Sequence, residues 1–364
     1  MKTLRNSEAK TIPARGTTVG LDVGDRHSQF CILDEGGGIV AEGRLRTTAE
    51  TLNEHFTRWA RSRVVLEAGT SSAWISRLAS AAGHEVIVAN PRELRKIHQS
   101  DRKNDRTDAQ VLARMARFDP QLLAPITHRS AAMQNDLAVV RARDVLVRAR
   151  TQCVNAVRGL VKTAGGRLTT CSTESFAHKV SAQLPNGLES ALEPMLKTIE
   201  ALTEQIRAYD RIIDELASRY PATEVLRQVT GVGALTAVTY ALTLGDPSRF
   251  GSSRDIGAYL GLVPRQHDSG NHVSQLSITK AGNTLLRRLL VGSAHYILGV
   301  HGPDCDLRRH GERLMTRGGK NAKKRALVAV ARKLAVLLHR LWIAGELYNP
   351  LHSGANNRQA AQEA

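Results

Sequence analysis

Between Thr18 and Pro91 the chain alternates strand-like and helix-like segments in an order that restricts its fold more than any other feature. The segments TVGLDVG, HSQFCILD and IVAEGRLR, with a glycine-rich turn at Glu35–Gly38, predict three antiparallel strands. They are followed by the helical stretch TAETLNEHFTRWA, the apolar run RVVLEAG, the helix SAWISRLASAAG and the strand HEVIVANP. This order predicts a mixed sheet with flanking helices.

A three-stranded meander followed by alternating helices and strands is the order of an RNase H-like, or RuvC-like, α/β domain. The actin and sugar-kinase superfold begins in the same way, and the segment GLDVG is also compatible with its phosphate loop. The sequence lacks GxxxxGKS or GxxxxGKT and has no convincing second glycine-rich phosphate loop. An RNase H-like domain is therefore favoured over an ATPase of that superfold.

After Pro91 helical patterns replace strand patterns. Between residues 130 and 161 apolar side chains recur at helical spacing, namely at Leu137, Val140, Val147, Val154 and Val157. A second helical stretch, from Leu188 to Arg219, is predicted to pack back on the first as an antiparallel hairpin or coiled coil. The arginines of the first stretch form either a nucleic-acid contact surface or the solvated face of an ordinary helical linker.

The C-terminal third is predicted to be mainly helical. Gly231-Val232-Gly233 lies between two helical stretches and resembles a helix-hairpin-helix, whose turn either faces a phosphate or simply packs tightly. The segment GLVPRQHDSGNHVSQLSIT predicts a hairpin or irregular loop, and Arg308–Arg340 predicts a basic helix. The predicted organisation is a flexible leader (1–16), an RNase H-like domain (17–125), a coiled coil (126–221), a C-terminal domain (222–348) and a flexible tail (349–364).

The charge balance indicates a polyanionic partner. Lys and Arg number 51 against 34 Asp and Glu, which gives a net charge of +17. This favours nucleic acid, while an acidic protein or an anionic membrane surface stays possible. No run approaches the roughly 18 apolar residues of a membrane span, the N-terminus has no secretory pattern, and the four cysteines are scattered, so we expect a cytoplasmic protein.

Four carboxylates have positions that suit a metal site. Asp22 interrupts an apolar strand, Glu67 ends another, and Asp105 and Asp108 lie three residues apart at the start of a helix. Oxygen ligands of this kind can hold two Mg²⁺ or Mn²⁺ ions for phosphodiester chemistry. Taken singly, Glu67 can instead pair with an arginine and Asp105 can cap its helix.

The combination of GLDVG, VVLEAGTSS, KNDRTDA, GLVPRQHDSG and ITKAGNTLLRRLL resembles the insertion sequence 110 family of transposases, also called bridge-RNA-guided recombinases. The resemblance covers roughly residues 17–341. It implies a RuvC-like DEDD domain with Asp22, Glu67, Asp105 and Asp108 as the acids, a coiled coil, and a C-terminal transposase domain with a catalytic serine. By position in the motif, that serine is Ser269.

From its residue context alone, Ser269 is a turn residue, and only the resemblance makes it a nucleophile that forms a phosphoserine link to DNA. The resemblance also implies that a noncoding guide RNA pairs with target and donor DNA. It further implies a homo-oligomer, a dimer or a tetramer in the synapse, whose protomers share the active site. No membrane partner is expected.

The cationic side chains expected to contact nucleic acid fall into two groups. Those of the helical region are Arg141, Arg143, Arg148, Arg150 and Arg158, and those of the C-terminal region are Arg265, Lys280, Arg287, Lys320, Lys323, Lys324 and Arg325. Two other functions remain open at this point: a metal-dependent nuclease or junction resolvase without serine chemistry, and a noncatalytic RNA-binding or architectural protein.

Overall fold

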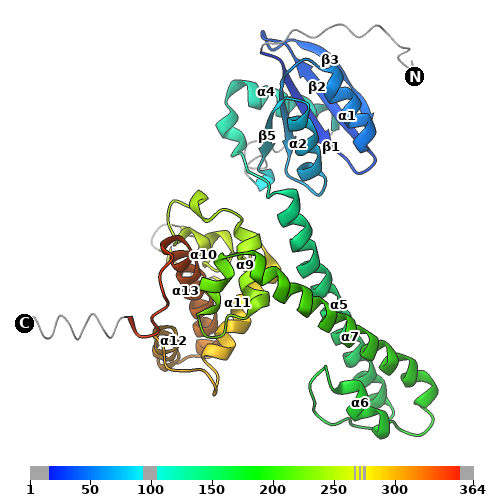
Figure 1. Cartoon of the computed structure of the whole chain (residues 1–364), viewed down its shortest axis with the longest axis vertical. Coiled ribbons are helices and arrows are strands. Elements are labelled where there is room, and N and C mark those ends of the chain that lie inside the picture. The colour runs from blue at the N-terminus through cyan, green and yellow to red at the C-terminus, as the bar shows by residue number, and fades with distance from the viewer. Residues whose placement is uncertain (1–15, 93–104, 266–267, 270–271, 274–275, 353–364) are drawn as a thin grey trace, which may run out of the picture. The chain divides into compact units, whose positions relative to one another are not determined.

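The structure is a computed structural model that describes residues 16–92, 105–265, 268–269, 272–273 and 276–352. The chain divides into two compact units, residues 1–131 and 132–364 (Figure 1). The predicted leader, apart from Gly16, and the predicted tail beyond residue 352 lie outside the described residues.

The first unit contains the predicted mixed sheet, with strand order β3-β2-β1-β4-β5. β1 pairs antiparallel with β2, and β2 with β3, whereas β1, β4 and β5 run parallel. This confirms both the meander and the parallel strands after it, in an arrangement consistent with an RNase H-like domain. The strands are β1 (Thr18–Val23), β2 (His27–Leu33), β3 (Ile39–Arg46), β4 (Arg63–Glu67) and β5 (Glu85–Ala89).

Helices cover both faces of this sheet. Because side chains alternate along a strand, Val64 and Leu66 enter a core with α1 (Ala49–Arg58) and α2 (Ser72–Ala81). Val65 lies in a separate core with residues of α4 (Asp105–Phe118) and the short 3-10 helix η1 (Pro120–Leu123). The two faces therefore have different environments, and α4 alone of these three α-helices belongs to the second core.

The second unit begins with the predicted antiparallel helical hairpin. Helix α5 (Ala131–Thr163) pairs with α7 (Glu189–Arg219), and α6 (Phe176–Val180) with η2 (Ser181–Gln183) lies in the connection (Figure 1). The Arg143 Nε donates to Asp210 at 2.6 Å, and one helical heptad later the Arg150 Nη1 donates to Thr203 at 3.2 Å. Contacts that advance along α5 and recede along α7 confirm that the two helices are antiparallel.

The rest of the second unit is mainly helical and includes a short β-hairpin. Its core joins all the α-helices from α8 onward, and the buried Tyr240 hydroxyl donates to the Ala335 carbonyl at 2.6 Å. The elements are α8 (Ala222–Arg227), α9 (Ala234–Leu244), η3 (Pro247–Arg249), α10 (Asp255–Tyr259), β6 (Asp268–Ser269), β7 (His272–Val273), α11 (Thr284–Ile297), α12 (Asp306–Thr316) and α13 (Ala322–Ala344).

Two details refine the sequence prediction. The expected continuous helix over Arg308–Arg340 is wrong, because Gly318 and Gly319 adopt φ values of +70° and +92° and separate α12 from α13. Gly231, in the turn between α8 and α9, has φ +87°, and a Cβ there would lie 3.2 Å from the Ser293 carbonyl. Gly231 therefore packs tightly against α11, which is one of the two interpretations of this turn that the sequence allowed.

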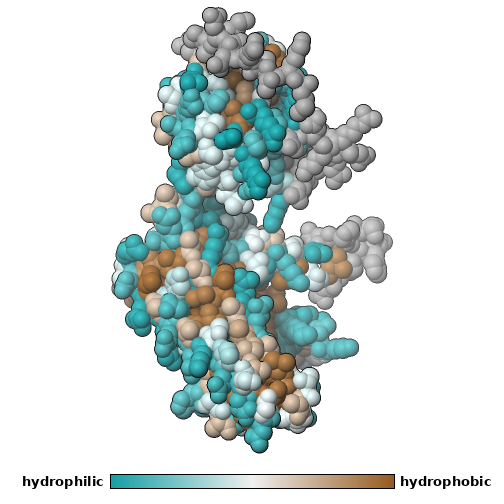
Figure 2. Space-filling view, turned by 90° about the vertical axis from the view of Figure 1, so that its right-hand side faces the viewer, coloured by the Kyte–Doolittle hydropathy of each residue, from teal (hydrophilic) through white to brown (hydrophobic). Residues whose placement is uncertain are grey.

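Among the described residues, no helix has both the length and the apolar character needed to cross a membrane. On the face shown in Figure 2, hydrophobic surface is divided into patches by hydrophilic residues.

Candidate active site

Asp22 and Glu67 lie at the ends of two adjacent parallel strands in the centre of the sheet. Leu21 of β1 is in register with Leu66 of β4, and the two acids are the next residues along each strand. Both side chains are half-buried. The carboxyl ends of parallel strands meet at one edge, so this register brings the two carboxylates to the same end of the sheet.

The same two acids face the side of the sheet that α4 covers. Gly20, two residues before Asp22, lies so close to α4 that a Cβ would be 2.0 Å from the Ala109 carbonyl oxygen. Val65, two residues before Glu67, belongs to the core shared with α4. Since alternate residues of a strand share a face, Asp22 and Glu67 both project toward the α4 side.

Helix α4 runs in the direction opposite to β1 and β4. Near the start of β4, the Arg63 Nη1 donates to the Ala116 carbonyl at 3.2 Å, while Ala109 lies farther along, against Gly20. The first turn of α4, with the half-buried Asp108, therefore lies toward the strand ends that carry Asp22 and Glu67. Asp22, Glu67 and Asp108 therefore lie toward the same end of one face of the sheet.

The donor chemistry of this region fits a hard divalent cation, because carboxylate oxygens are the ligands that Mg²⁺ and Mn²⁺ prefer. No three His, Cys, Asp or Glu side chains among the described residues are grouped closely enough to hold one metal ion. The side chain of Asp105 lies outside that description. Mg²⁺ usually binds through one or two carboxylates together with substrate phosphates, so a complete cage of protein ligands is not required.

A histidine that the sequence analysis did not identify braces the turn after Glu67. The His128 Nε2 lies 3.0 Å from the Ser72 hydroxyl, which donates to the Gly69 carbonyl at 2.8 Å and accepts from the Gly69 N–H at 3.0 Å. Burial, with smaller contributions from Arg77 and Arg129, lowers the pKa of His128. No local motif connects residues 72 and 128, which explains why sequence reasoning missed this contact.

Ser269 lies in the short hairpin that the sequence allowed. It ends β6 and is in register with His272 of β7, while Pro264 and Ile278 form a bridge farther from the tip. The backbone therefore places Ser269 at the end of β6, opposite His272. Its side chain lies outside the described residues, so its role remains a prediction.

The predicted nucleic-acid contacts divide into exposed cations and cations used inside the protein. Arg141, Arg148, Arg265, Lys280 and the group Lys320, Lys323, Lys324 and Arg325 are exposed. Arg158 is half-buried over the Phe176 ring, and the Arg287 Nη1 donates to the Leu260 and Ala281 carbonyls. These last two side chains have partners within the fold.

Arg150 requires a correction. It is only 5% exposed in the interface between α5 and α7, where it bonds to Thr203. Burial is the main reason that its pKa is lowered. A side chain enclosed between two helices cannot contact an external backbone, so we exclude Arg150 from the nucleic-acid surface.

Comparison with known proteins identifies the family. A DEDD transposase model of the IS110 type matches residues 19–165, and a model described as transposase IS116/IS110/IS902 family matches residues 223–306. The chain is 30% identical to the transposase of insertion sequence element IS1111A from Coxiella burnetii, over 91% of this chain and 90% of that protein.

Two further relatives agree. A probable family 20 transposase from Pseudomonas aeruginosa is 28% identical, over 91% of this chain and 98% of its own length. The transposase of IS1328 from Yersinia enterocolitica is 29% identical, over 76% of this chain and 83% of its own length. The chain therefore belongs to the IS110 family of insertion-sequence transposases, and it is a DNA transposase.

Proposed function

We propose that this transposase cuts and rejoins DNA through a serine nucleophile, with divalent metal held by Asp22, Glu67, Asp105 and Asp108. The observation that carries the proposal is the register of β1 and β4, which sets Asp22 beside Glu67 on the face covered by α4. Bound Mg²⁺ or Mn²⁺ supplies Lewis-acid stabilisation of charge on the phosphate oxygens.

In the proposed reaction, the Ser269 oxygen attacks the scissile phosphorus atom and replaces one bridging sugar oxygen. The serine proton leaves, the released sugar oxygen takes up a proton, and a phosphoserine ester links protein to DNA. Attack of a sugar hydroxyl from another strand on that ester reverses the process. The bond energy is retained in the ester, so joining requires no nucleotide cofactor.

We further propose that an element-encoded guide RNA chooses the sites and that a homo-oligomer performs the exchange. The net charge of +17 supports binding to nucleic-acid backbone, as expected where base pairing supplies sequence specificity. Sequencing of the RNA that copurifies with the protein tests this part. Transcripts that match the DNA flanking the gene support a guide, whereas bulk cellular RNA alone contradicts it.

Trapping of the covalent intermediate tests the chemistry. Purified protein is incubated with Mg²⁺, its copurified RNA and labelled donor and target DNA, then denatured and resolved by electrophoresis. The unaltered chain should give a labelled protein–DNA adduct, and Ser269→Ala should give neither adduct nor joined product. Ser277→Ala, which changes an exposed serine of the same segment, is the matched control and should retain both.

The carboxylates have a separate readout. Asp22→Asn or Glu67→Gln should abolish cleavage while RNA binding stays within about twofold, and Asp25→Asn, at an exposed neighbouring position, should leave cleavage intact. Cleavage that survives in Ser269→Ala but is lost in Asp22→Asn would instead identify a metal-dependent nuclease. Cleavage that survives in Asp22→Asn and Glu67→Gln would overturn the metal site.

A further inference from the structure

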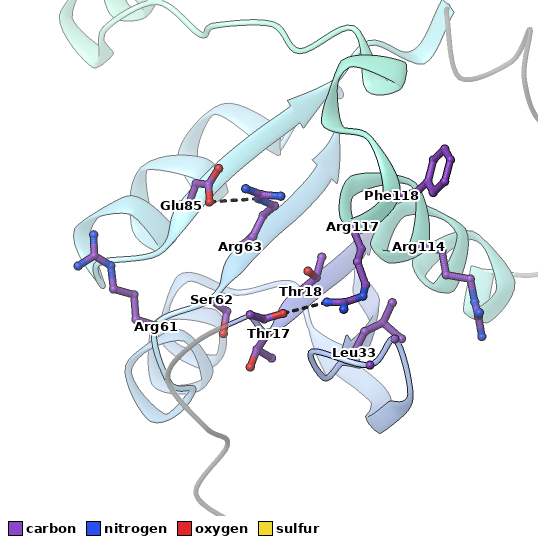
Figure 3. Close-up of a pocket in the computed structure, with 13 residues that line it drawn as sticks. Thr17, Thr18, Leu33, Arg61, Ser62, Arg63, Glu85, Arg114, Arg117 and Phe118 are labelled. Atoms are coloured by element: carbon purple, nitrogen blue, oxygen red, sulfur yellow. Dashed lines mark hydrogen bonds and ion pairs between the residues drawn. The ribbon is translucent and has the colours of Figure 1, made fainter.

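The first unit has a second polar site, at the end of the sheet opposite to Asp22 and Glu67. A pocket of about 1000 Å³ opens where β1 and β4 begin, between these strands and the end of α4 (Figure 3). Thr18, at its wall, precedes Asp22 by four residues, which corresponds to about 13 Å along a strand. The pocket is therefore distinct from the proposed metal site.

Arginines dominate the charge of this pocket. Its lining includes Arg61, Arg63, Arg114 and Arg117, and Glu85 is its acidic residue. The Arg63 Nε lies 3.1 Å from the Glu85 carboxylate, and the Arg117 Nη1 donates to the Gly16 carbonyl at 3.2 Å. These two guanidinium groups are held in place by the fold, and three positive charges remain after Glu85 is balanced.

The other two arginines are available to a ligand. Arg61 and Arg114 are exposed, and neither has a hydrogen bond or ion pair to another described residue. Figure 3 shows Arg61 on the β4 side of the pocket and Arg114 on α4, so that they flank the opening from opposite sides. Guanidinium groups bind phosphate oxygens in a paired geometry, which makes the site suited to a phosphodiester backbone.

An exposed aromatic ring completes the site. Phe118, the last residue of α4, lines the pocket and is 86% exposed. In Figure 3 its ring projects outward from the end of α4, whereas the Arg117 side chain extends toward Thr17. A single exposed apolar residue is ordinary, but an aromatic ring beside a cationic groove is the combination that binds unpaired nucleotides, because every base offers a face for stacking.

We propose that this pocket binds an unpaired stretch of nucleic acid, with backbone phosphates on Arg61, Arg117 and Arg114 and one base stacked on Phe118. The site lies away from the acids assigned to cleavage, so its function is to hold a strand rather than to cut it. Both RNA and DNA present this chemistry, and the experiment distinguishes them. The proposal does not depend on Ser269 or on metal binding.

The test measures fluorescence anisotropy of the full-length protein, without metal, against labelled single-stranded 20-mers of RNA and of DNA with one sequence. Arg61→Ala/Arg114→Ala should weaken binding and lower the slope of log affinity against log salt by about 1.4, since each lost phosphate contact contributes about 0.7. The control Arg44→Ala/Arg46→Ala removes two exposed charges from β3 and should change the slope by less than half as much.

Phe118 separates stacking from charge. Phe118→Leu should weaken single-strand binding about tenfold, Phe118→Trp should restore it, and affinity for duplex DNA should change less than twofold. The strand that responds more strongly, RNA or DNA, identifies the natural ligand. Unchanged affinity in both Arg61→Ala/Arg114→Ala and Phe118→Leu would overturn the site, as would an equal loss in Arg44→Ala/Arg46→Ala. Circular dichroism of each variant verifies folding.

Discussion

The Ala109 carbonyl of α4 lies against Gly20 of β1 so closely that a Cβ at residue 20 would be 2.0 Å from its oxygen. This contact brings the helix backbone onto the sheet two residues before Asp22. The position of Asp108 relative to the strand-borne acids therefore depends on the absence of a side chain at residue 20.

Gly20→Ala should displace α4, because backbone atoms cannot give way as a flexible side chain can. We expect a loss of about 1–3 kcal/mol in the stability of the first unit, together with loss of DNA cleavage. Thermal melting monitored by circular dichroism measures the first effect. Gly69→Ala is the stability control, since a Cβ there has no neighbour within 4 Å among the described residues; equal melting of the two variants would contradict this account.

His128 should make stability depend on pH. Its pKa is lowered in the folded state, so its contribution is complete above the unfolded value of about 6.5 and is lost as the pH falls through the folded value. His128→Gln should therefore flatten the fall in melting temperature between pH 7 and pH 5. His27→Gln, at an exposed position of β2, should follow the unaltered chain.

Tyr220 should make the stability of the protein depend on pH in the alkaline range. Its hydroxyl donates to Asp136 at 2.6 Å, and burial followed by this bond raises its pKa to about 12. A raised pKa means that the contribution is complete below about pH 10 and is lost as the pH rises toward 12. Tyr220→Phe should cost about 1 kcal/mol at pH 8, and the difference from the unaltered chain should shrink above pH 10.

Urea unfolding at pH 8, 10 and 11 measures the effect of Tyr220→Phe. Tyr296→Phe serves as control, because Tyr296 is 48% exposed. The free energies of unfolding of Tyr220→Phe and of the unaltered chain should approach each other as the pH rises. If their difference stays constant up to pH 11, ionisation of Tyr220 does not weaken the bond between α5 and the end of α7, and the prediction is contradicted.

The arginines of α5 should differ in their contribution to DNA binding according to the face of the helix that they occupy. Arg141→Ala/Arg148→Ala removes two exposed cations and should lower the salt slope of duplex DNA binding by about 1.8. Arg150→Met should leave that slope unchanged, and it should leave stability unchanged or raise it, because Arg150 Nε is buried without a hydrogen-bond partner among the described residues. If Arg150→Met lowered the salt slope as much as Arg141→Ala/Arg148→Ala does, the assignment of Arg150 to the protein interior would be contradicted.

Much of the secondary structure of this protein could be predicted from local patterns, because many elements carry a period or an apolar run of their own. Alternation around Leu21, the turn formers at Glu35–Gly38 and the apolar run that ends at Glu67 were enough to place strands of the mixed sheet. Apolar residues at helical spacing likewise identified α5. The exception was the basic C-terminal stretch, where strong helical periodicity on both sides concealed the break at Gly318 and Gly319.

The sequence by itself determined which residues can serve: an acid inside an apolar strand, a serine in a turn and a large excess of arginine. Only the tertiary structure decided how they are used. Helical periodicity does not specify which stripe of α5 meets α7, so it could not show that Arg150 is enclosed while Arg148 is exposed. Contacts such as His128 with Ser72 join distant segments, and their formation depends on chain packing that no local pattern encodes.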